Sequence, residues 1–245
     1  MEFFLFDFLS DVLSGFVMTV INFLVDCTGS YGWSLVLLAV LIKVALYGPT
    51  KHQFESMKNM QKVQPEMQRI QEKYKDDQEK MQKELMRLYK ENNVNPLGGC
   101  LPMLVQLPIL WAIWRAIIQY QTIFESSYFL WLGTPLAYKY PDLFSKSLAG
   151  QDAVLLLVYG FSMYLTQKST TPASDPKMAK QQSSMGLIMT IFFTYMMWQW
   201  KMPCALIVYW LVFNILSIIQ QIMIMSGKPE AKPTTEKTSA GSPAT

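Results

Sequence analysis

A lysine within an apolar segment is the side chain in this sequence best placed to attract a ligand. Lys43 lies in the run LLAVLIKVAL, which carries no other charge. A lysine at the centre of a bilayer costs about 2.5–3.5 kcal/mol on insertion scales. Its ammonium group can extend toward the nearby headgroups, or it can face a hydrated cavity inside a helix bundle. Because the apolar segments offer no clear acidic partner, the second interpretation predicts attraction for a visiting anion.

Uncharged polar residues interrupt the other apolar segments. Gln106 lies in one of them, and Trp210, Asn214 and Ser217 follow at positions i, i+4 and i+7 in the last. That spacing places the three residues on one face of a helix. One interpretation is that each residue only forms a hydrogen bond to a neighbouring helix. Together with the lysine they favour a hydrophilic groove, whose predicted lining is Lys43, Gln106, Trp210, Asn214 and Ser217.

The sequence lacks the signatures of common catalytic and metal sites. It contains no intramembrane aspartate pair, no His-Glu-x-x-His, no Gly-x-Ser-x-Gly and no glycine-rich phosphate loop. The one histidine, His52, lies just past an apolar segment, and Cys27, Cys100 and Cys204 match neither a disulfide framework nor a zinc pattern. We therefore expect no enzymatic activity, no bound metal and no cofactor.

The composition indicates that these residues lie in a membrane. The 245 residues are 51% hydrophobic and only 16% charged, whereas about a quarter of the residues are charged in soluble domains. Ten of the 21 Lys and Arg residues and eight of the 18 Asp and Glu residues fall within 51–96, so the rest is poorer still in charge. A net charge of +3 is too small to indicate binding of nucleic acid, and we expect no direct nucleic-acid recognition.

Hydropathy and periodicity divide the chain into membrane spans and polar connections. In residues 51–96, apolar side chains recur every three or four positions on both sides of Lys75-Asp76-Asp77-Gln78, which predicts an antiparallel helical hairpin. We expect an all-α polytopic membrane protein. Its predicted parts are an amphipathic interfacial helix 1–28 on the outside, five transmembrane helices at 29–50, 97–118, 151–166, 185–200 and 203–225, the cytoplasmic hairpin 51–96, an outer loop 119–150, a cytoplasmic loop 167–184 and a disordered cytoplasmic tail 226–245.

Two of these assignments have alternatives. Residues 3–25 can also form a first membrane span, but Asp7, Asp11 and the lack of an unbroken apolar run of span length favour a helix in the interface plane. Pro65 either kinks the first arm of the hairpin or begins a new helix there.

The basic residues predict the orientation. Residues 1–30 contain no Lys or Arg. With the N-terminus outside and the C-terminus in the cytoplasm, 16 basic residues lie on the cytoplasmic side and three lie in the outer loops. This distribution agrees with the positive-inside rule.

Several short motifs, taken in order, resemble one known family. The stretch Asn95-Pro96-Leu97-Gly98-Gly99-Cys100-Leu101-Pro102 and the ending Tyr209-Trp210, Asn214, Gln220-Gln221 are the most specific of them. Leu41-Ile42-Lys43, Pro49-Thr50-Lys51 and Ile70-Gln71-Glu72-Lys73-Tyr74 add to the pattern. Over roughly residues 30–225 the chain resembles the YidC/Oxa/Albino family of membrane-protein insertases, in its short five-span form.

The resemblance implies a fold and a site. The implied fold is a five-helix bundle with a groove that is open to the cytoplasm and to lipid but closed on the outer side. The groove carries a basic residue, commonly arginine in bacterial members, and Lys43 stands at that place. Lysine keeps the positive charge but lacks the two-pronged donor set that arginine offers a carboxylate.

The resemblance also implies a function and partners. The expected function is to insert nascent membrane proteins and help them fold, without chemical catalysis, in the bacterial plasma (inner) membrane. Nascent membrane proteins and membrane lipids are the expected partners, and the ribosome and the Sec translocon are further candidates. The alternative is a small anion or solute transporter with Lys43 in its binding site, for which we find no supporting internal repeat.

Overall fold

The computed structural model describes residues 2–92, 94, 101–170 and 176–226, and every regular element within them is a helix. The predicted disorder of the tail falls on residues outside this set, apart from Ser226. The elements are α1 (Glu2–Thr28), α2 (Tyr31–Ala45), α3 (Tyr47–Lys73), α4 (Gln78–Glu91), α5 (Leu101–Gln119), α6 (Gln121–Glu125), α7 (Pro135–Lys139), α8 (Ala153–Thr170), α9 (Pro176–Gln199) and α10 (Cys204–Ser226).

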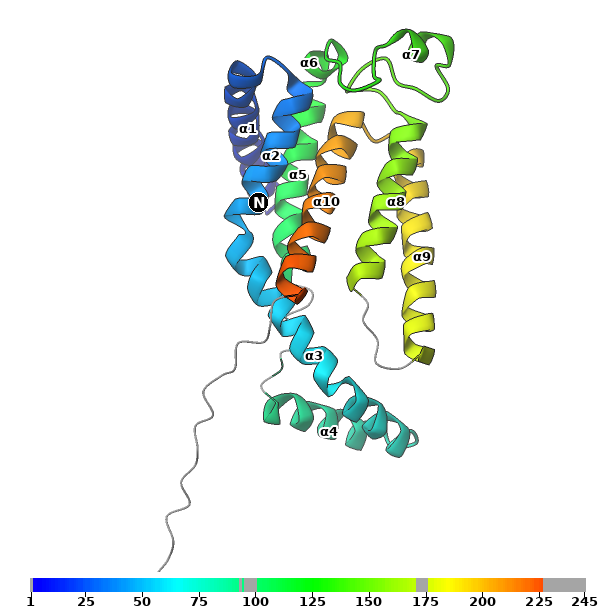
Figure 1. The fold of residues 1–245 in the computed structure, drawn as a ribbon. Coiled ribbons are helices and arrows are strands. Elements are labelled where there is room, and N and C mark those ends of the chain that lie inside the picture. Colours follow the sequence, from blue (N-terminus) through cyan, green and yellow to red (C-terminus); the bar gives the residue numbers. More distant parts are fainter. Residues whose placement is uncertain (1, 93, 95–100, 171–175, 227–245) are drawn as a thin grey trace, which may run out of the picture.

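Helix α10 lies at the centre of the bundle. It packs against α8 on one side and α2 on the other, and it also contacts α5. At one edge α9 packs on α8, and at the other edge α1 packs along α2 and α5. Figure 1 shows α6 and α7 at one end of the bundle and α3 with α4 at the other. We call these the loop end and the hairpin end.

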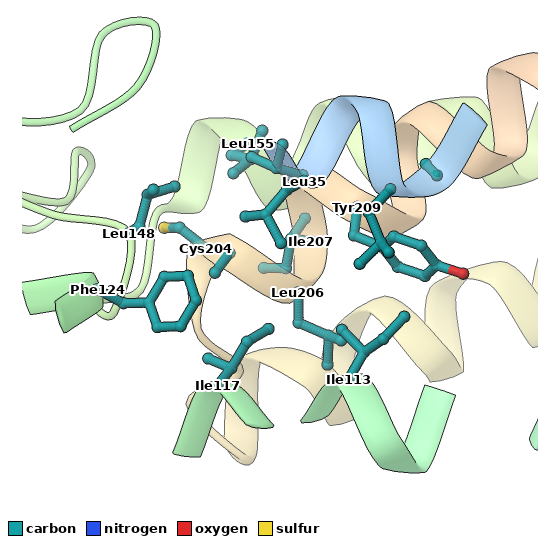
Figure 2. Close-up of a cluster of buried hydrophobic side chains, with 14 of the residues drawn as sticks. Leu35, Ile113, Ile117, Phe124, Leu148, Leu155, Cys204, Leu206, Ile207 and Tyr209 are labelled. Carbon is teal, nitrogen blue, oxygen red and sulfur yellow. The ribbon is translucent and has the colours of Figure 1, made fainter. Parts of the chain in front are cut away.

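The apolar core is concentrated toward the loop end. The residues from Cys204 to Tyr209 are all buried, so α10 is covered on every face where it begins. Within a bilayer, close packing rather than hydrophobic transfer holds helices together. The side chains that pack around the start of α10 come from α2, α5, α6, α8 and the loop after α7, and Figure 2 shows among them Leu35, Ile113, Ile117, Phe124, Leu148 and Leu155.

A buried aspartate fastens the loop to the bundle. Asp152 is fully buried immediately before α8 and accepts hydrogen bonds from the backbone N–H groups of Leu155 at 2.7 Å and Ser145 at 2.9 Å. The indole N–H of Trp131 also donates to its carboxylate, at 3.1 Å. The side chain therefore caps the helix and fixes two distant parts of the loop. The loop end is closed by this network and by the apolar core.

The helical hairpin expected in residues 51–96 is present as α3 and α4. The two helices are joined by a turn at residues 74–77 and pack through a small apolar cluster of Val63, Leu88 and Val94. Helix α3 begins earlier than expected, at Tyr47, and it continues through Pro65 without a new start. It meets α2 at a bend of 61°. The predicted span 29–50 therefore contains a break at Leu46, and Gly48 and Pro49 lie in the first turn of α3.

By length and composition, fewer described helices qualify as membrane spans than the five that the sequence predicts. Among the described residues, Ser10–Thr28 of α1 and Cys204–Ile224 of α10 are each apolar and long enough to cross a membrane, and the bent pair of α2 and α3 makes a third candidate. Helix α1, which was expected to lie in the interface plane, thus meets the criterion for a span. In Figure 1 it lies beside the loop-end part of α2. The count of five spans and the placement of α1 in the interface plane stay predictions.

Candidate functional site

Lys43 lies in the last turn of α2 and contacts two residues of α10. Its Nζ donates to the Oε1 atom of Gln220 at 3.4 Å, and it lies 4.2 Å from the centre of the Phe213 ring. The side chain is half-buried. Both partners are neutral, and Lys43 takes part in none of the ion pairs found among the described residues. The predicted cation is therefore present at the surface of α10, with no carboxylate bound to it.

Gln220 is a site residue that the sequence analysis missed. Its side chain is only 8% exposed. While Oε1 accepts from Lys43, the Nε2 atom is buried and has no acceptor within the described part of the chain. A buried donor without an acceptor costs about 1–3 kcal/mol. The one sequence signal for this residue was its position in the Gln220-Gln221 pair of the family resemblance.

Gln106 reaches α10 at a different point. Its Nε2 atom donates to the hydroxyl of Tyr209 at 3.2 Å, which links α5 to α10. Tyr209 is fully buried, whereas Gln106 is half-buried. Tyr209, Phe213 and Gln220 are spaced i, i+4 and i+11, so the partners of Gln106 and Lys43 share one face of α10.

The three predicted residues of α10 lie on the neighbouring face. Trp210 packs on Tyr159 of α8 with ring centres 5.5 Å apart. Asn214 is buried and donates from Nδ2 to the hydroxyl of Ser162, also on α8, at 3.4 Å. Ser217 donates to the carbonyl of Phe213 in its own helix at 2.7 Å. The three residues do lie on one face of α10. At Trp210 and Asn214 this face contacts α8 and does not face Lys43.

The five predicted residues therefore line two faces of α10. Successive side chains of an α-helix point in directions about 100° apart around the helix axis. The face that contains Tyr209 and the face that contains Trp210 are therefore about 100° apart. Lys43 and Gln106 belong to the first face, and Trp210, Asn214 and Ser217 belong to the second. Helical spacing alone grouped the three α10 residues correctly but did not indicate which helix each face meets.

An ion pair between two helices lies nearer the loop end. Arg115 of α5 forms an ion pair with Asp11 of α1, with Nη2 and Oδ1 3.0 Å apart, and Ser14 donates to Gln119 at 3.1 Å. The arginine is thus neutralised, whereas Lys43 is not. The described residues contain no cluster of three His, Cys, Asp or Glu side chains that suits a metal ion. Lys43 is consequently the side chain best suited to attract an anion within the helical bundle.

An opening between α8 and α9 offers a different environment. It has a volume of about 510 Å³ and is lined mostly by apolar side chains, and its polar groups, among them the hydroxyls of Thr190 and Thr194, are uncharged. Gly160 permits close approach there, because a Cβ atom would lie 2.8 Å from the hydroxyl oxygen of Thr194. With no charged group in its lining, this opening does not suit an anion.

Comparison with known proteins relates the fold and the site to one group. The family model of the 60Kd inner membrane protein matches residues 23–232. The chain is 37% identical over 204 residues to the membrane protein insertase YidC of Geobacter sp. (strain M21), which covers 83% of this chain and 35% of that protein. It is 34% identical to the corresponding protein of Legionella pneumophila (strain Corby), over 90% of this chain and 37% of that one. The chain thus spans about a third of the length of these relatives.

A solved structure is also similar. The crystal structure described as an active YidC insertase with the first transmembrane domain resolved superposes with a TM-score of 0.63 at 28% identity. The match covers 85% of this chain and 45% of the other. The helical arrangement described above is therefore shared with that structure.

Proposed function

Because the chain belongs to the 60Kd inner membrane protein family, the family of the YidC insertases, we propose that it inserts nascent membrane proteins into the bacterial inner membrane and helps them fold. The observation that carries the proposal is the difference between the two ends of the bundle. A cation with only neutral partners lies in the last turn of α2, whereas the loop end is closed by the apolar core and the Asp152 network.

The proposed mechanism has no covalent step. The hairpin of α3 and α4 receives an apolar nascent segment on the cytoplasmic side. A hydrated groove then lets a short hydrophilic tail of the substrate enter the membrane without losing all of its water. Lys43 attracts acidic side chains of that tail. The apolar segment leaves sideways into lipid, driven by burial at about 25 cal/mol per Å².

We propose that the groove follows both faces of α10. Lys43 and Gln106 line one face, and Trp210, Asn214 and Ser217 line the other. The N-terminus lies outside and the C-terminus in the cytoplasm, with five spans, as the distribution of basic residues favours. Membrane lipids contact the open side. The ribosome and the Sec translocon are proposed as further partners.

Site-specific crosslinking to a stalled substrate tests this function. A photoreactive amino acid is placed at Gln106 or Ser217, and at Leu132 in the loop-end core as the matched control. A ribosome-stalled chain that exposes one apolar span should crosslink to the first two positions and not to the third. Equal crosslinking at all three, or none in a protein that restores insertion to depleted cells, would contradict the proposed groove.

The transporter alternative has less support. The relatives named above carry the name of insertases, and a transporter of small anions would need a site closed around its solute. Lys43 is instead half-buried, near the junction with the protruding hairpin. An insertase with a half-buried cation beside the hairpin, unpaired within the described part of the chain, accounts for that position more directly.

A further inference from the structure

We propose that Gln220 is a neutral placeholder for the carboxylate of a substrate. Its amide oxygen occupies the position beside Lys43 that an acidic side chain of the nascent protein takes during insertion. Gln220 therefore sets how strongly the groove prefers acidic substrates. This inference rests on the proposed function, and it adds a specificity-determining residue to the site.

The contact between Lys43 and Gln220 is weak enough for a carboxylate to replace the amide oxygen. The distance from Nζ to Oε1 is 3.4 Å, whereas an ammonium group and a carboxylate oxygen approach to about 2.7–2.9 Å. Among the described residues, the ammonium group also lies over the face of the Phe213 ring, 4.2 Å from its centre. An ammonium group has three donors, and within the described part of the chain one of them has a hydrogen-bond acceptor. A carboxylate brings a charge that neither neutral partner has.

The nitrogen of the Gln220 amide points to the same conclusion. Nε2 is buried and has no acceptor among the described residues, and the residue as a whole is only 8% exposed. The amide is thus held by one contact and is unsatisfied at its second polar group. When a carboxylate binds Lys43, the amide group of Gln220 is free to rotate, and its N–H groups can then donate to an acceptor. Release of the placeholder then offsets part of the cost of displacing it.

The residue type fits this role better than glutamate would. Glutamate has the same length as glutamine but would place a permanent negative charge beside Lys43. Such an internal ion pair would neutralise the cation and compete with every acidic substrate. An amide oxygen shields the ammonium group between substrates while leaving its charge in place. The neutral amide therefore keeps the site available.

The test compares two substrates in one set of variants. Single-span substrates that differ only in an acidic or a neutral outer tail are inserted into vesicles containing the full-length protein. For Gln220→Glu, the ratio of acidic to neutral insertion rates should fall by about tenfold or more, because a closely held internal ion pair must be broken. The matched control is Gln221→Glu, which adds the same charge one residue later, where the native side chain donates to the carbonyl of Ser169 on α8. Its ratio should stay at the wild-type value.

Gln220→Met provides the second test and does not depend on the folding of the glutamate variant. It removes the oxygen while keeping the length and bulk of the side chain. The placeholder role predicts an acidic-to-neutral ratio above the wild-type ratio, because no amide oxygen has to be displaced from Lys43. A fall in that ratio would mean that Gln220 itself binds the substrate, and the proposal would be wrong. An unchanged ratio in folded Gln220→Glu, or equal falls in Gln220→Glu and Gln221→Glu, would also overturn it. If the wild-type protein inserts neither substrate, the proposed function fails instead.

Discussion

At the scale of single residues, the proposed function depends on the positive charge of Lys43 and on its neutral partners. Arg115 has a carboxylate partner in Asp11 at 3.0 Å, and Lys43 has an amide and an aromatic ring. The difference separates a cation that holds two helices together from one that is available to a ligand. Substitutions at Lys43 should therefore affect substrates according to their charge.

We predict that Lys43 requires its charge rather than its exact shape. Lys43→Arg should support insertion of acidic-tailed substrates at close to the wild-type rate, because arginine keeps the charge and adds a two-pronged donor set. Lys43→Ala should lower that rate by about tenfold, the effect of losing about 1.4 kcal/mol of attraction, and Lys43→Glu should lower it further. Insertion rates in a strain depleted of its own insertase measure these effects. Wild-type rates for every substrate with Lys43→Ala would show that the lysine only extends toward the headgroups.

Asp152 should matter for stability rather than for substrate choice. Asp152→Ala leaves the donors of Trp131, Ser145 and Leu155 without their acceptor and removes a helix cap. We expect a loss of about 2–4 kcal/mol from these causes. Thermal unfolding in detergent should show a lower midpoint, and Asp142→Ala, an exposed loop position, is the matched control. An equal midpoint for both variants would contradict the structural role of the buried carboxylate.

At the scale of elements, the tip of the hairpin is held by an electrostatic cap. The side chain of Lys80 lies 2.8 Å from the Asp77 carboxylate, and the backbone N–H of Lys80 donates to it at 3.1 Å. These two hydrogen bonds lower the pKa of Asp77 below its usual value. A lowered pKa means that the stabilisation is complete above the ordinary aspartate pKa of about 3.9 and is lost as the pH falls through the lowered value.

We therefore predict that the first turn of α4 loosens on acidification. In isotope-labelled full-length protein, the amide chemical shift of Lys80 should move toward its random-coil value below about pH 4. Asp77→Asn keeps an acceptor for the backbone N–H but cannot titrate, so the shift should lose this pH dependence. Asp76→Asn, at the adjacent exposed position, should keep the wild-type profile. A titration that persists in Asp77→Asn would assign the effect to another group.

At the scale of the whole molecule, the two ends of the bundle should differ in hydration. Single cysteines at Gln106 and Ser217, in a background without Cys27, Cys100 and Cys204, should react with a small water-soluble maleimide added to inverted vesicles. Cysteines at Leu35 and Leu206 in the loop-end core should not react, because both positions are buried. Inertness of all four positions in a functional protein would mean that the polar residues of α10 serve only to pack helices.

The sequence predicted much of this organisation because hydropathy and helical spacing are local properties. The hairpin and the shared face of Trp210, Asn214 and Ser217 followed from residues close together in the chain, and so did the choice of Lys43 as a candidate site residue. The role of Asp152 could not follow in this way, since its donors are Trp131, Ser145 and Leu155. Gln220 was missed because the faces that begin at Tyr209 and Trp210 are equally plausible until their neighbouring helices are known.

The same limit applies to α1. Its two aspartates favoured a helix in the interface plane, but one of them, Asp11, is paired with Arg115 of α5. A charge that is paired between helices no longer argues against a location beside the bundle. Such a pair joins residues about a hundred positions apart, which no local pattern can indicate.

The central position of α10 also has a consequence for how the protein itself is made. This helix follows all the others in the described chain, yet it separates α2 from α8 and contributes to the core on both sides. During synthesis the earlier helices therefore lack their common partner. Until α10 is made, the group of α1, α2 and α5 and the pair of α8 and α9 lack the surface that joins them. We therefore expect a translation product that ends before α10 to leave the contact surfaces of both groups uncovered.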